Sequence, residues 1–258
     1  PAVAKGAAPV ESVRRVFEDR KSAEAGQLSS HGEAGRYFVS FLDNHDQNQR
    51  IQHPLTPVEQ VTLALALLFS LQGIPCVYYG TEQGLSGTVK PDGSFDLNSP
   101  EATREALWGK TPLAFDKTHP KYLAIRALGA LRLEEPALAY GRLYFREVAG
   151  AGTNDFGLSN GVGGVVAFSR VLGDREVVVV ANTSSTGRFT GSVIVDRDIN
   201  AIPRQMQVAF SNLGTKGTGT VRQMGMARFF GADGVSTGPA AALPVDLAPR
   251  EVQILLPL

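Results

Sequence analysis

The chain has 258 residues, which is enough for one large domain or two modest domains, each with its own hydrophobic core. Its 25 basic and 25 acidic residues balance, so its charge gives no argument for nucleic acid or an anionic membrane as a partner. The sequence shows no signal-peptide pattern and no apolar run of membrane-spanning length, and it leaves the cellular compartment unassigned.

The first predicted element is a helix over residues 10–25. The segment is rich in charged side chains, and Val13, Val16 and Phe17 give it only a narrow apolar stripe at helical spacing. This pattern is typical of a solvated helix on the outside of a larger fold.

A buried strand followed by a polar cluster is predicted next. Residues 37–42 form a short apolar and aromatic run, the composition of a strand covered on both faces. Asp43, Asn44, His45 and Asp46 follow without a spacer. Charged clusters at the carboxyl ends of parallel strands carry the chemistry of α/β barrels, but Asp and Asn also stabilise ordinary turns. These residues alone leave both interpretations open.

The following residues predict a buried helix. Thr56 is expected to be its N-cap, with Pro57 at the first helical position and Glu59 closing a capping box. Residues 61–71 are almost wholly apolar, which indicates a helix buried all round.

A second apolar strand is predicted over residues 74–79. Its Cys76 is expected to act as a small buried hydrophobe. Strand, helix and strand together predict a βαβ unit of a parallel sheet. The handedness of such units places both polar loops, residues 43–46 and 80–84, at the same edge.

The rest of the chain divides into a long connection, a helix and a β-rich region. Residues 83–118 are rich in Gly and Pro, and a connection of this length is usually functional or mobile. A helix is predicted over residues 121–135. Short β-rich runs with Gly, Asn and Ser clusters between them then predict an antiparallel sandwich, with strands at residues 143–148, 164–171, 176–181, 189–195, 206–210 and 251–256.

Three segments resemble motifs of the α-amylase family of glycoside hydrolases. Phe41-Leu-Asp-Asn-His-Asp46 is similar to the motif of that family's seventh barrel strand. Gly73-Ile-Pro-Cys-Val-Tyr-Tyr-Gly-Thr-Glu82 resembles the eighth-strand motif, and Arg104-Glu-Ala-Leu-Trp108 resembles the Arg-to-Trp segment that follows it. Each motif is weak alone, but the three stand in the family's order and spacing.

The resemblance implies a fold and a domain division. Residues 1–136 are expected to be the C-terminal part of a (β/α)8 TIM barrel, with strands seven and eight and their helices. Residues 137–258 are expected to form the antiparallel β-sandwich domain that follows the barrel in α-amylase relatives, with residues 245–255 as its last hairpin.

The resemblance also implies roles for individual residues. Asp46 takes the place of the carboxylate that stabilises the transition state, and His45 that of the side chain that binds a hydroxyl of the same sugar. Arg50 is expected to bind substrate, to pair with that carboxylate cluster, or to shape the pocket. The family's usual spacing would put this arginine at position 49, which is Gln49 here.

Four further residues have structural and functional interpretations. Asp43 and Asn44 are expected to be structural supports, because Asx side chains commonly stabilise turns. Glu82 is open between holding a loop and contacting substrate. Trp108 is either a sugar-stacking platform or a packing residue, and packing is the preferred interpretation.

The catalytic pair itself is not expected in this chain. In the resembled family the nucleophilic Asp ends the fourth strand and the acidic Glu ends the fifth, and residues 1–36 contain nothing that replaces them. The chain is therefore expected to be the C-terminal part of an α-amylase-type enzyme, catalytically incomplete alone. It shows no spacing typical of a metal site, and any calcium requirement is expected in the missing part.

The predicted function is retaining cleavage of α-glucosidic bonds in an α-glucan or maltooligosaccharide. An α-glucosyltransferase of the same family is one alternative, and a non-catalytic carbohydrate- or protein-binding module is another. An N-terminal chain that completes the barrel is a predicted partner, because an open two-stranded piece would leave apolar edges exposed.

Overall fold

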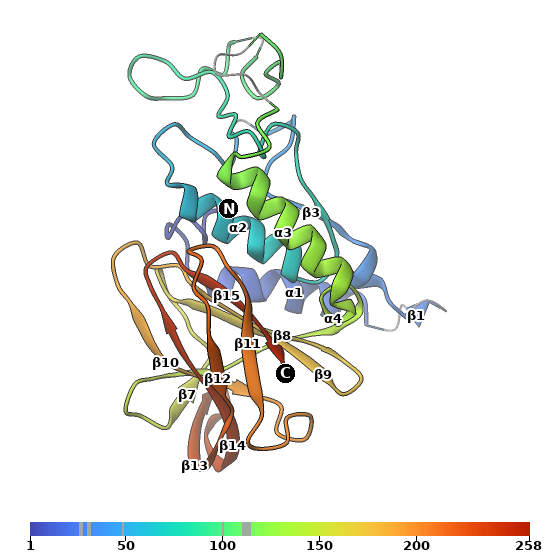
Figure 1. Ribbon diagram of the computed structural model, residues 1–258, viewed down its shortest axis with the longest axis vertical. Helices are drawn as coiled ribbons and strands as arrows, with labels where there is room; N and C mark the ends of the chain where they lie inside the picture. Colours follow the sequence, from blue (N-terminus) through green and yellow to red (C-terminus); the bar gives the residue numbers. More distant parts are fainter. Residues whose placement is uncertain (26–27, 30–31, 48, 100, 110–114) are drawn as a thin grey trace.

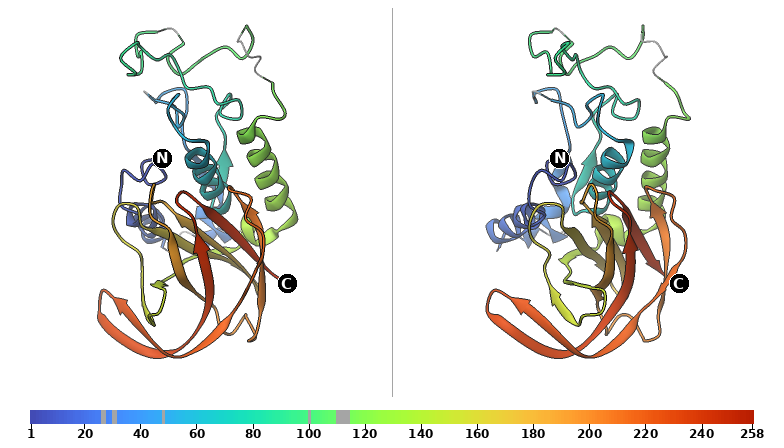
Figure 2. Two further views of the ribbon diagram at one scale, coloured as in Figure 1. Left: turned by 60° about the vertical axis from the view of Figure 1, so that its left-hand side comes forward. Right: turned by 90° about the vertical axis from the view of Figure 1, so that its left-hand side faces the viewer.

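The computed structural model describes residues 1–25, 28–29, 32–47, 49–99, 101–109 and 115–258. Helices lie on one side of a large β-sheet, and a second sheet lies on its other side (Figures 1 and 2). The described loops within residues 83–109 form the end of the molecule farthest from the two sheets (Figure 1). No described helix has the length and apolar character needed to cross a membrane.

The predicted βαβ unit is confirmed. Strands β3 (Val39–Phe41) and β4 (Ile74–Cys76) pair in parallel, with Val39 opposite Ile74 and Phe41 opposite Cys76. Helix α2 (Val58–Ser70) connects them, and every residue from Gln60 to Ser70 is buried. The helix is hydrophobic all round because protein covers both of its sides.

The start of α2 differs from the predicted capping box. Pro57 occupies the N-cap position, and no side chain caps the helix there. The Thr56 hydroxyl instead accepts a hydrogen bond from the His53 N–H at 3.0 Å, in the turn before the helix. Because the Thr56 hydroxyl is used in this turn, it does not cap the helix, which begins at Val58.

The remaining short elements surround this unit. Helix α1 (Glu11–Ala23) has no buried residue, which confirms the predicted solvated helix. A two-residue pairing of β1 (Leu28–Ser29) with β2 (Gly32–Glu33) and a 3-10 turn, η1 (Ala34–Tyr37), lead into β3.

Helix α3 follows the long connection and is joined at once by a short helix. His119 caps α3 (Pro120–Glu134) by accepting from the Lys121 N–H. The Glu135 carboxylate accepts from the Ala137 N–H at the start of α4 (Pro136–Tyr140). The chain therefore turns from α3 into α4 within one residue.

The second half of the chain forms two sheets. The six-stranded sheet is antiparallel, in the order β12-β11-β15-β9-β8-β5, and the other sheet closes in the order β10-β14-β13-β7-β6, with β7 and β13 parallel. The strands are β5 (Arg142–Phe145), β6 (Val148–Gly150), β7 (Asp155–Gly157), β8 (Val165–Leu172), β9 (Arg175–Asn182), β10 (Phe189–Val195), β11 (Gln205–Ser211), β12 (Thr218–Thr220), β13 (Arg222–Gly231), β14 (Gly234–Leu247) and β15 (Val252–Pro257).

The residues predicted as a last hairpin do not pair with each other. Strand β14 pairs with β10 and β13, whereas β15 pairs with β9 and β11 in the other sheet. The four residues between them carry the chain from one sheet to the other. Their sequence has the turn signals of a hairpin, but pairing depends on neighbours elsewhere in the chain.

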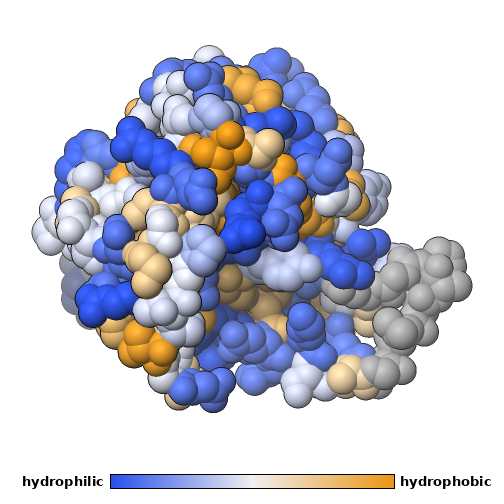
Figure 3. All heavy atoms as spheres, turned by 90° about the horizontal axis from the view of Figure 1, so that it is seen from below, coloured by the Kyte–Doolittle hydropathy of each residue, from blue (hydrophilic) through white to orange (hydrophobic). Residues whose placement is uncertain are grey.

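The six-stranded sheet is the middle layer of the molecule. Because strand side chains alternate between faces, Val177 and Val179 of β9 pack with the helices, and Val178 and Val180 pack with the second sheet. All eight residues of β9 except Arg175 are buried. Seen from below, small groups of hydrophobic side chains are separated by hydrophilic ones on the face formed by the sheets (Figure 3).

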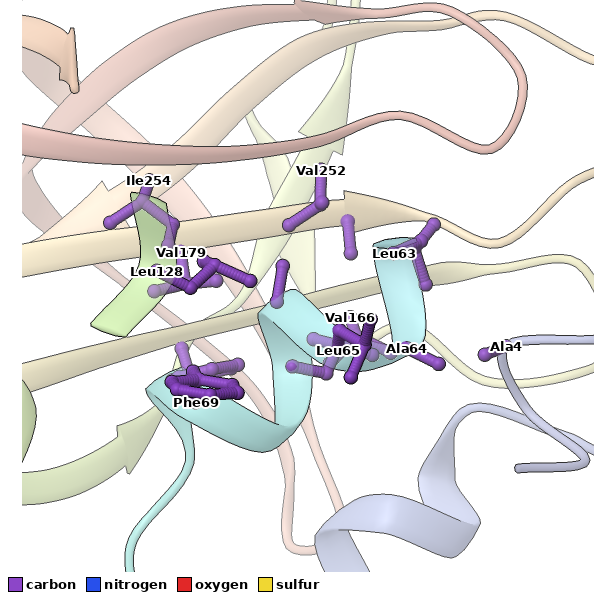
Figure 4. Close-up of a cluster of buried hydrophobic side chains, with 14 of the residues drawn as sticks. Ala4, Leu63, Ala64, Leu65, Phe69, Leu128, Val166, Val179, Val252 and Ile254 are labelled. Carbon is purple, nitrogen blue, oxygen red and sulfur yellow. The ribbon is translucent and has the colours of Figure 1, made fainter. Parts of the chain in front are cut away.

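Helix α2 packs on the helix-facing side of this sheet. Leu63, Leu65 and Phe69 from the helix share a buried cluster with β8, β9 and β15 (Figure 4). The sheet contributes Val166, Phe168, Val177, Val179, Val252 and Ile254 to it. The predicted barrel segment and the β-rich half therefore share one hydrophobic core.

Two arginines satisfy the last carbonyls of α2, which have no partner within the helix. Arg170 of β8 is fully buried and donates to the Ser70 carbonyl at 2.7 Å and the Gly141 carbonyl at 2.9 Å. Arg132 of α3 donates to the Phe69 carbonyl at 2.6 Å. The end of α2 is thus bonded to the sheet and to α3.

The exposure of the parallel pair differs from the sequence prediction. Val39, Phe41 and Ile74 are about half exposed, and Cys76 is exposed as well. The prediction of a strand covered on both faces, with a buried cysteine, is wrong for this chain. Strands β3 and β4 pair only with each other among the described residues, so no further strand covers their outer edges.

The Arg170 contacts generate a stability prediction. Replacing Arg170 with Met keeps most of the side-chain volume but removes the bonds to Ser70 and Gly141, so the free energy of unfolding should fall by about 1.5–3 kcal/mol. Urea unfolding monitored by circular dichroism measures this change. Arg197→Met is the control, since the Arg197 side chain is 57% exposed and its ion pair is with its exposed neighbour Asp198; a loss equal to that of the control would contradict the prediction.

Candidate active site

The two predicted polar loops lie at the same edge of the parallel pair. The first loop begins after β3 and the second after β4. Arg50, beyond the first loop, donates through Nη2 to the Tyr79 carbonyl at 2.9 Å, next to the second loop. The carboxyl ends of parallel strands are where barrel enzymes place their chemistry.

Asp43 and Asn44 hold the first loop in shape. The Asn44 Oδ1 accepts from the N–H groups of Asp46 and Gln47, both at 2.9 Å. Asp43 is buried, and its Oδ2 accepts from the Ile51 N–H at 2.9 Å. The structural roles predicted for both residues are confirmed.

His45 and Asp46 are left free to face solvent by this loop. The His45 Nε2 and Asp46 Oδ1 atoms are 3.1 Å apart, and the two side chains are 59% and 69% exposed. Arg104 approaches from the long connection, with its Nη2 3.7 Å from Asp46 Oδ1 and its Nε donating to the His45 carbonyl at 3.3 Å. The Asp46 carboxylate, the His45 ring nitrogen and the Arg104 guanidinium thus lie close together.

These side chains line an open pocket of about 320 Å³. One wall is the loop after β3, and the opposite wall comes from the long connection. The described lining residues are His45, Asp46, Gln47, Leu97, Ser99, Ala102, Thr103 and Arg104. Among them Asp46 is the sole carboxylate, so these residues can stabilise positive charge and bind hydroxyl groups.

Arg50 lies outside this lining. Its side chain has no exposed surface, and its Nε donates to Glu105 Oε2 at 2.8 Å. The guanidinium carbon also lies 4.5 Å from the centre of the Tyr78 ring. The structure pairs Arg50 with a carboxylate, that of Glu105, and the sugar contact of Arg50 stays a prediction.

The other two candidate residues, Glu82 and Trp108, are not part of the pocket lining either. Burial and the Lys121 charge lower the pKa of the His119 imidazole, and a backbone hydrogen bond and the charge of Glu82 oppose this shift. Trp108 is 75% exposed and stacks on the exposed Phe115 ring with centroids 6.4 Å apart. The preferred interpretation of Trp108 as a packing residue is wrong, because the loop that carries it extends into solvent.

Two residues at this site had no role predicted from the sequence. Arg104 lines the pocket and Glu105 binds Arg50. Both belong to the Arg-to-Trp segment, and the resemblance of that segment to a family motif could have pointed to them. Their partners lie more than 50 residues away in the sequence, so no local pattern connects them.

No metal centre is evident in the part of the chain that the structure describes. No three or more His, Cys, Asp or Glu side chains within it gather closely enough to hold a metal ion.

Comparison with known proteins relates more than half of the chain to cyclomaltodextrin glucanotransferases and alpha-amylases. Residues 13–123 match the family described as alpha amylase, catalytic domain. A cyclomaltodextrin glucanotransferase of Paenibacillus macerans is 31% identical over 187 residues, which cover 69% of this chain and 22% of that protein. An alpha-amylase of Niallia circulans is 30% identical over 188 residues, covering 70% of this chain and 30% of that protein.

Solved structures extend the likeness in fold to nearly the whole chain. A cyclomaltodextrin glucanotransferase with a three-domain ABC distribution matches 99% of this chain and 42% of its own, with a TM-score of 0.66 and 21% identity. An Anoxybacillus alpha-amylase matches 97% of this chain and 43% of its own, with a TM-score of 0.59 and 20% identity. The chain spans less than a third of the length of the curated relatives described above.

The burial of Asp43 generates a prediction about pH. Desolvation raises the pKa of this carboxyl above its ordinary value of 3.8 and the Glu105 charge adds to the rise, while the Ile51 N–H and Arg50 oppose it. The folded protein therefore holds this proton more tightly than the unfolded chain, so this group lowers the free energy of unfolding as pH rises from 3.8 through the raised value.

Asp43→Asn keeps an acceptor for the Ile51 N–H and removes the ionisation. The stability of the variant relative to the parent should rise with pH across that interval and become constant above it, as measured by urea unfolding from pH 4 to 8. Asp92→Asn is the control: hydrogen bonds from Ser94 lower the pKa of Asp92, so its effect on stability changes only below pH 3.8 and its relative stability should be flat from pH 4 to 8. A relative stability of Asp43→Asn that is flat or falls with pH would contradict the prediction.

Proposed function

Through residues 13–123 the chain belongs to the α-amylase family, and from that premise we propose that it supplies one side of the active site of an α-glucan-active enzyme. The observation that carries the proposal is the exposed His45–Asp46 pair in a pocket at the carboxyl edge of two parallel strands. The reaction we propose is retaining cleavage of α-glucosidic bonds.

In this proposal the fold has the division expected from the sequence. Residues 1–136 are the last part of a (β/α)8 barrel, with β3 and β4 as its seventh and eighth strands, and residues 137–258 are a β-sandwich domain. Three observations support it: the parallel pairing of β3 with β4, the buried helix between them, and the two sheets with a shared core in the second half.

Asp46 is the proposed transition-state stabiliser. Retaining cleavage needs a nucleophilic carboxylate and an acid about 5–5.5 Å apart, and its transition state carries positive charge on the sugar ring. An exposed carboxylate fixed by the Asn44 turn can face that charge without first reorganising. His45, 3.1 Å from Asp46, is placed to bond a hydroxyl of the same sugar.

The nucleophile and the acid are proposed to come from polypeptide outside this chain. The described lining of the pocket has a single carboxylate, and the chain spans 22% of the P. macerans relative. Half-exposed apolar residues on β3 and β4 offer edges at which further parallel strands could add. Any calcium requirement would belong to that other part of the barrel.

Glucosyl transfer is the second candidate reaction. Its support is that the P. macerans protein and a Geobacillus stearothermophilus protein, 30% identical over 152 residues, both carry the name cyclomaltodextrin glucanotransferase. The same carboxylates serve transfer to a sugar as well as to water. Hydrolysis forms a new reducing end for each bond cleaved, whereas transfer redistributes glucan chains without a net gain of reducing ends. The ratio of new reducing ends to redistributed chains therefore separates the two reactions.

The role of Asp46 generates a kinetic prediction. In the full-length protein that carries this chain, Asp46→Asn should lower kcat for soluble starch by at least about 10²–10³-fold, because it removes charge stabilisation at the transition state. Stability should change little, since the Asp46 side chain is 69% exposed.

The measurement is the rate of reducing-sugar release, with Asp233→Asn in the distant β13–β14 turn as the matched control. A near-normal kcat in Asp46→Asn, together with an unchanged control, would contradict the proposed role.

A further inference from the structure

A buried ion pair joins the loop after β3 to the long connection. Arg50 and Glu105 are 55 residues apart in the sequence, yet Arg50 Nε donates to Glu105 Oε2 at 2.8 Å. Their side chains are 0% and 5% exposed. Burial of two charges requires that each find partners inside the protein.

Both ends of the pair have additional bonds. The second Glu105 oxygen accepts from the Gly87 N–H at 2.5 Å, and the Glu105 carbonyl accepts from the Tyr79 hydroxyl at 2.9 Å. Arg50 donates through Nη2 to the Tyr79 carbonyl and lies against the Tyr78 ring. Glu105 is therefore connected to the loop after β3, to the end of β4, and to the start of its own long connection.

Space around the pair is also tight. A Cβ on Gly80 would lie 2.5 Å from Leu85 Cδ1 and 3.2 Å from Arg50 Nη2, and one on Gly87 would lie 2.1 Å from the Ala102 carbonyl oxygen. Both glycines have positive φ, near +80°. The backbone can approach the pair this closely only because these positions lack side chains.

The pair adjoins the wall of the pocket. Thr103 and Arg104, the two residues before Glu105, line the pocket opposite Asp46. The Tyr78 hydroxyl bonds the Thr103 carbonyl at 3.0 Å, and Arg104 bonds the His45 carbonyl. The wall is thus held by these hydrogen bonds and, through the residue that follows Arg104, is linked directly to the Arg50–Glu105 pair.

Stability alone does not account for this arrangement. A buried ion pair is often no more stabilising than apolar residues of the same volume, and the Arg50 Nη1 finds no hydrogen-bond partner among the described residues. What the pair can supply in addition is a fixed geometry, because a buried polar network restricts the arrangements open to its groups.

We propose that Arg50 and Glu105 are positioning residues, which hold the wall formed by Thr103 and Arg104 at a fixed distance from Asp46. The pair acts on the sugar through that wall and does not touch it. The effect on catalysis rests on the function proposed above, whereas the effect on the order of the loop does not.

The test uses two variants and a reporter already in the chain. Glu105→Gln removes the charge, and the double variant Arg50→Met with Glu105→Leu removes both charges while keeping an apolar core that can fold. Trp108 is the chain's only tryptophan and lies three residues after Glu105, so its fluorescence anisotropy reports this loop. Glu134→Gln, at an exposed position on α3, is the matched control.

Hydrogen exchange of residues 101–109 should be at least about tenfold faster in both variants than in the parent, and Trp108 anisotropy should fall. In the full-length protein, KM for soluble starch should rise by about tenfold in the double variant, with a smaller change in kcat. Unchanged exchange would overturn the proposal. Faster exchange with an unchanged KM would also overturn it, because the pair would then order the loop without affecting substrate binding.

The two proposals fail in different ways. An unsubstituted full-length protein that is inactive on starch counts against the proposed function. The positioning role is then decided by the affinity of this chain for maltoheptaose, measured by Trp108 fluorescence. Binding about tenfold weaker in the double variant than in the parent supports the role. Equal binding by the two proteins, or no binding by either, overturns it.

Discussion

The burial of helix α2 on all sides is the constraint on which the rest of the structure depends. An all-apolar helix needs protein around its whole circumference, and here the six-stranded sheet covers one side while α3 and α4 cover another. Arg132 and Arg170 bond its last carbonyls from two of those elements. The β-rich half is therefore part of the support of the parallel strands and their loops.

This support explains why a small parallel pair can carry a defined site. Strands β3 and β4 have three residues each, and much of their apolar surface is exposed. The loops beyond them are held by buried polar contacts: Asp43 bonds Ile51, and Arg50 bonds Glu105. His45 and Asp46 are exposed between these fixed points, which suits groups that must meet a substrate.

Local sequence patterns predicted the elements of the site, and contacts between distant residues decided their details. Apolar runs and the Asn44 turn gave the βαβ unit and the polar edge. Burial of β3 was mispredicted because, among the described residues, only β4 pairs with it and its apolar side chains stay half exposed. The partner of Arg50 could not be identified from a local pattern because Glu105 is 55 residues away. Strand β14 was not predicted because its first nine residues, 234–242, are mostly Gly and Ala, which are depleted in strands.

The central claim is that this chain completes an α-glucan-active barrel through Asp46. The most direct measurement is reducing-sugar release from soluble starch by the chain alone, at confirmed intact mass, and after mixing with a polypeptide that carries the first six barrel strands. The account predicts no release by the chain alone and release on mixing, abolished by Asp46→Ala. Reducing-sugar release by the chain alone, abolished by Asp46→Ala, would contradict the account. An assembled mixture without activity would also contradict it and would favour a binding module.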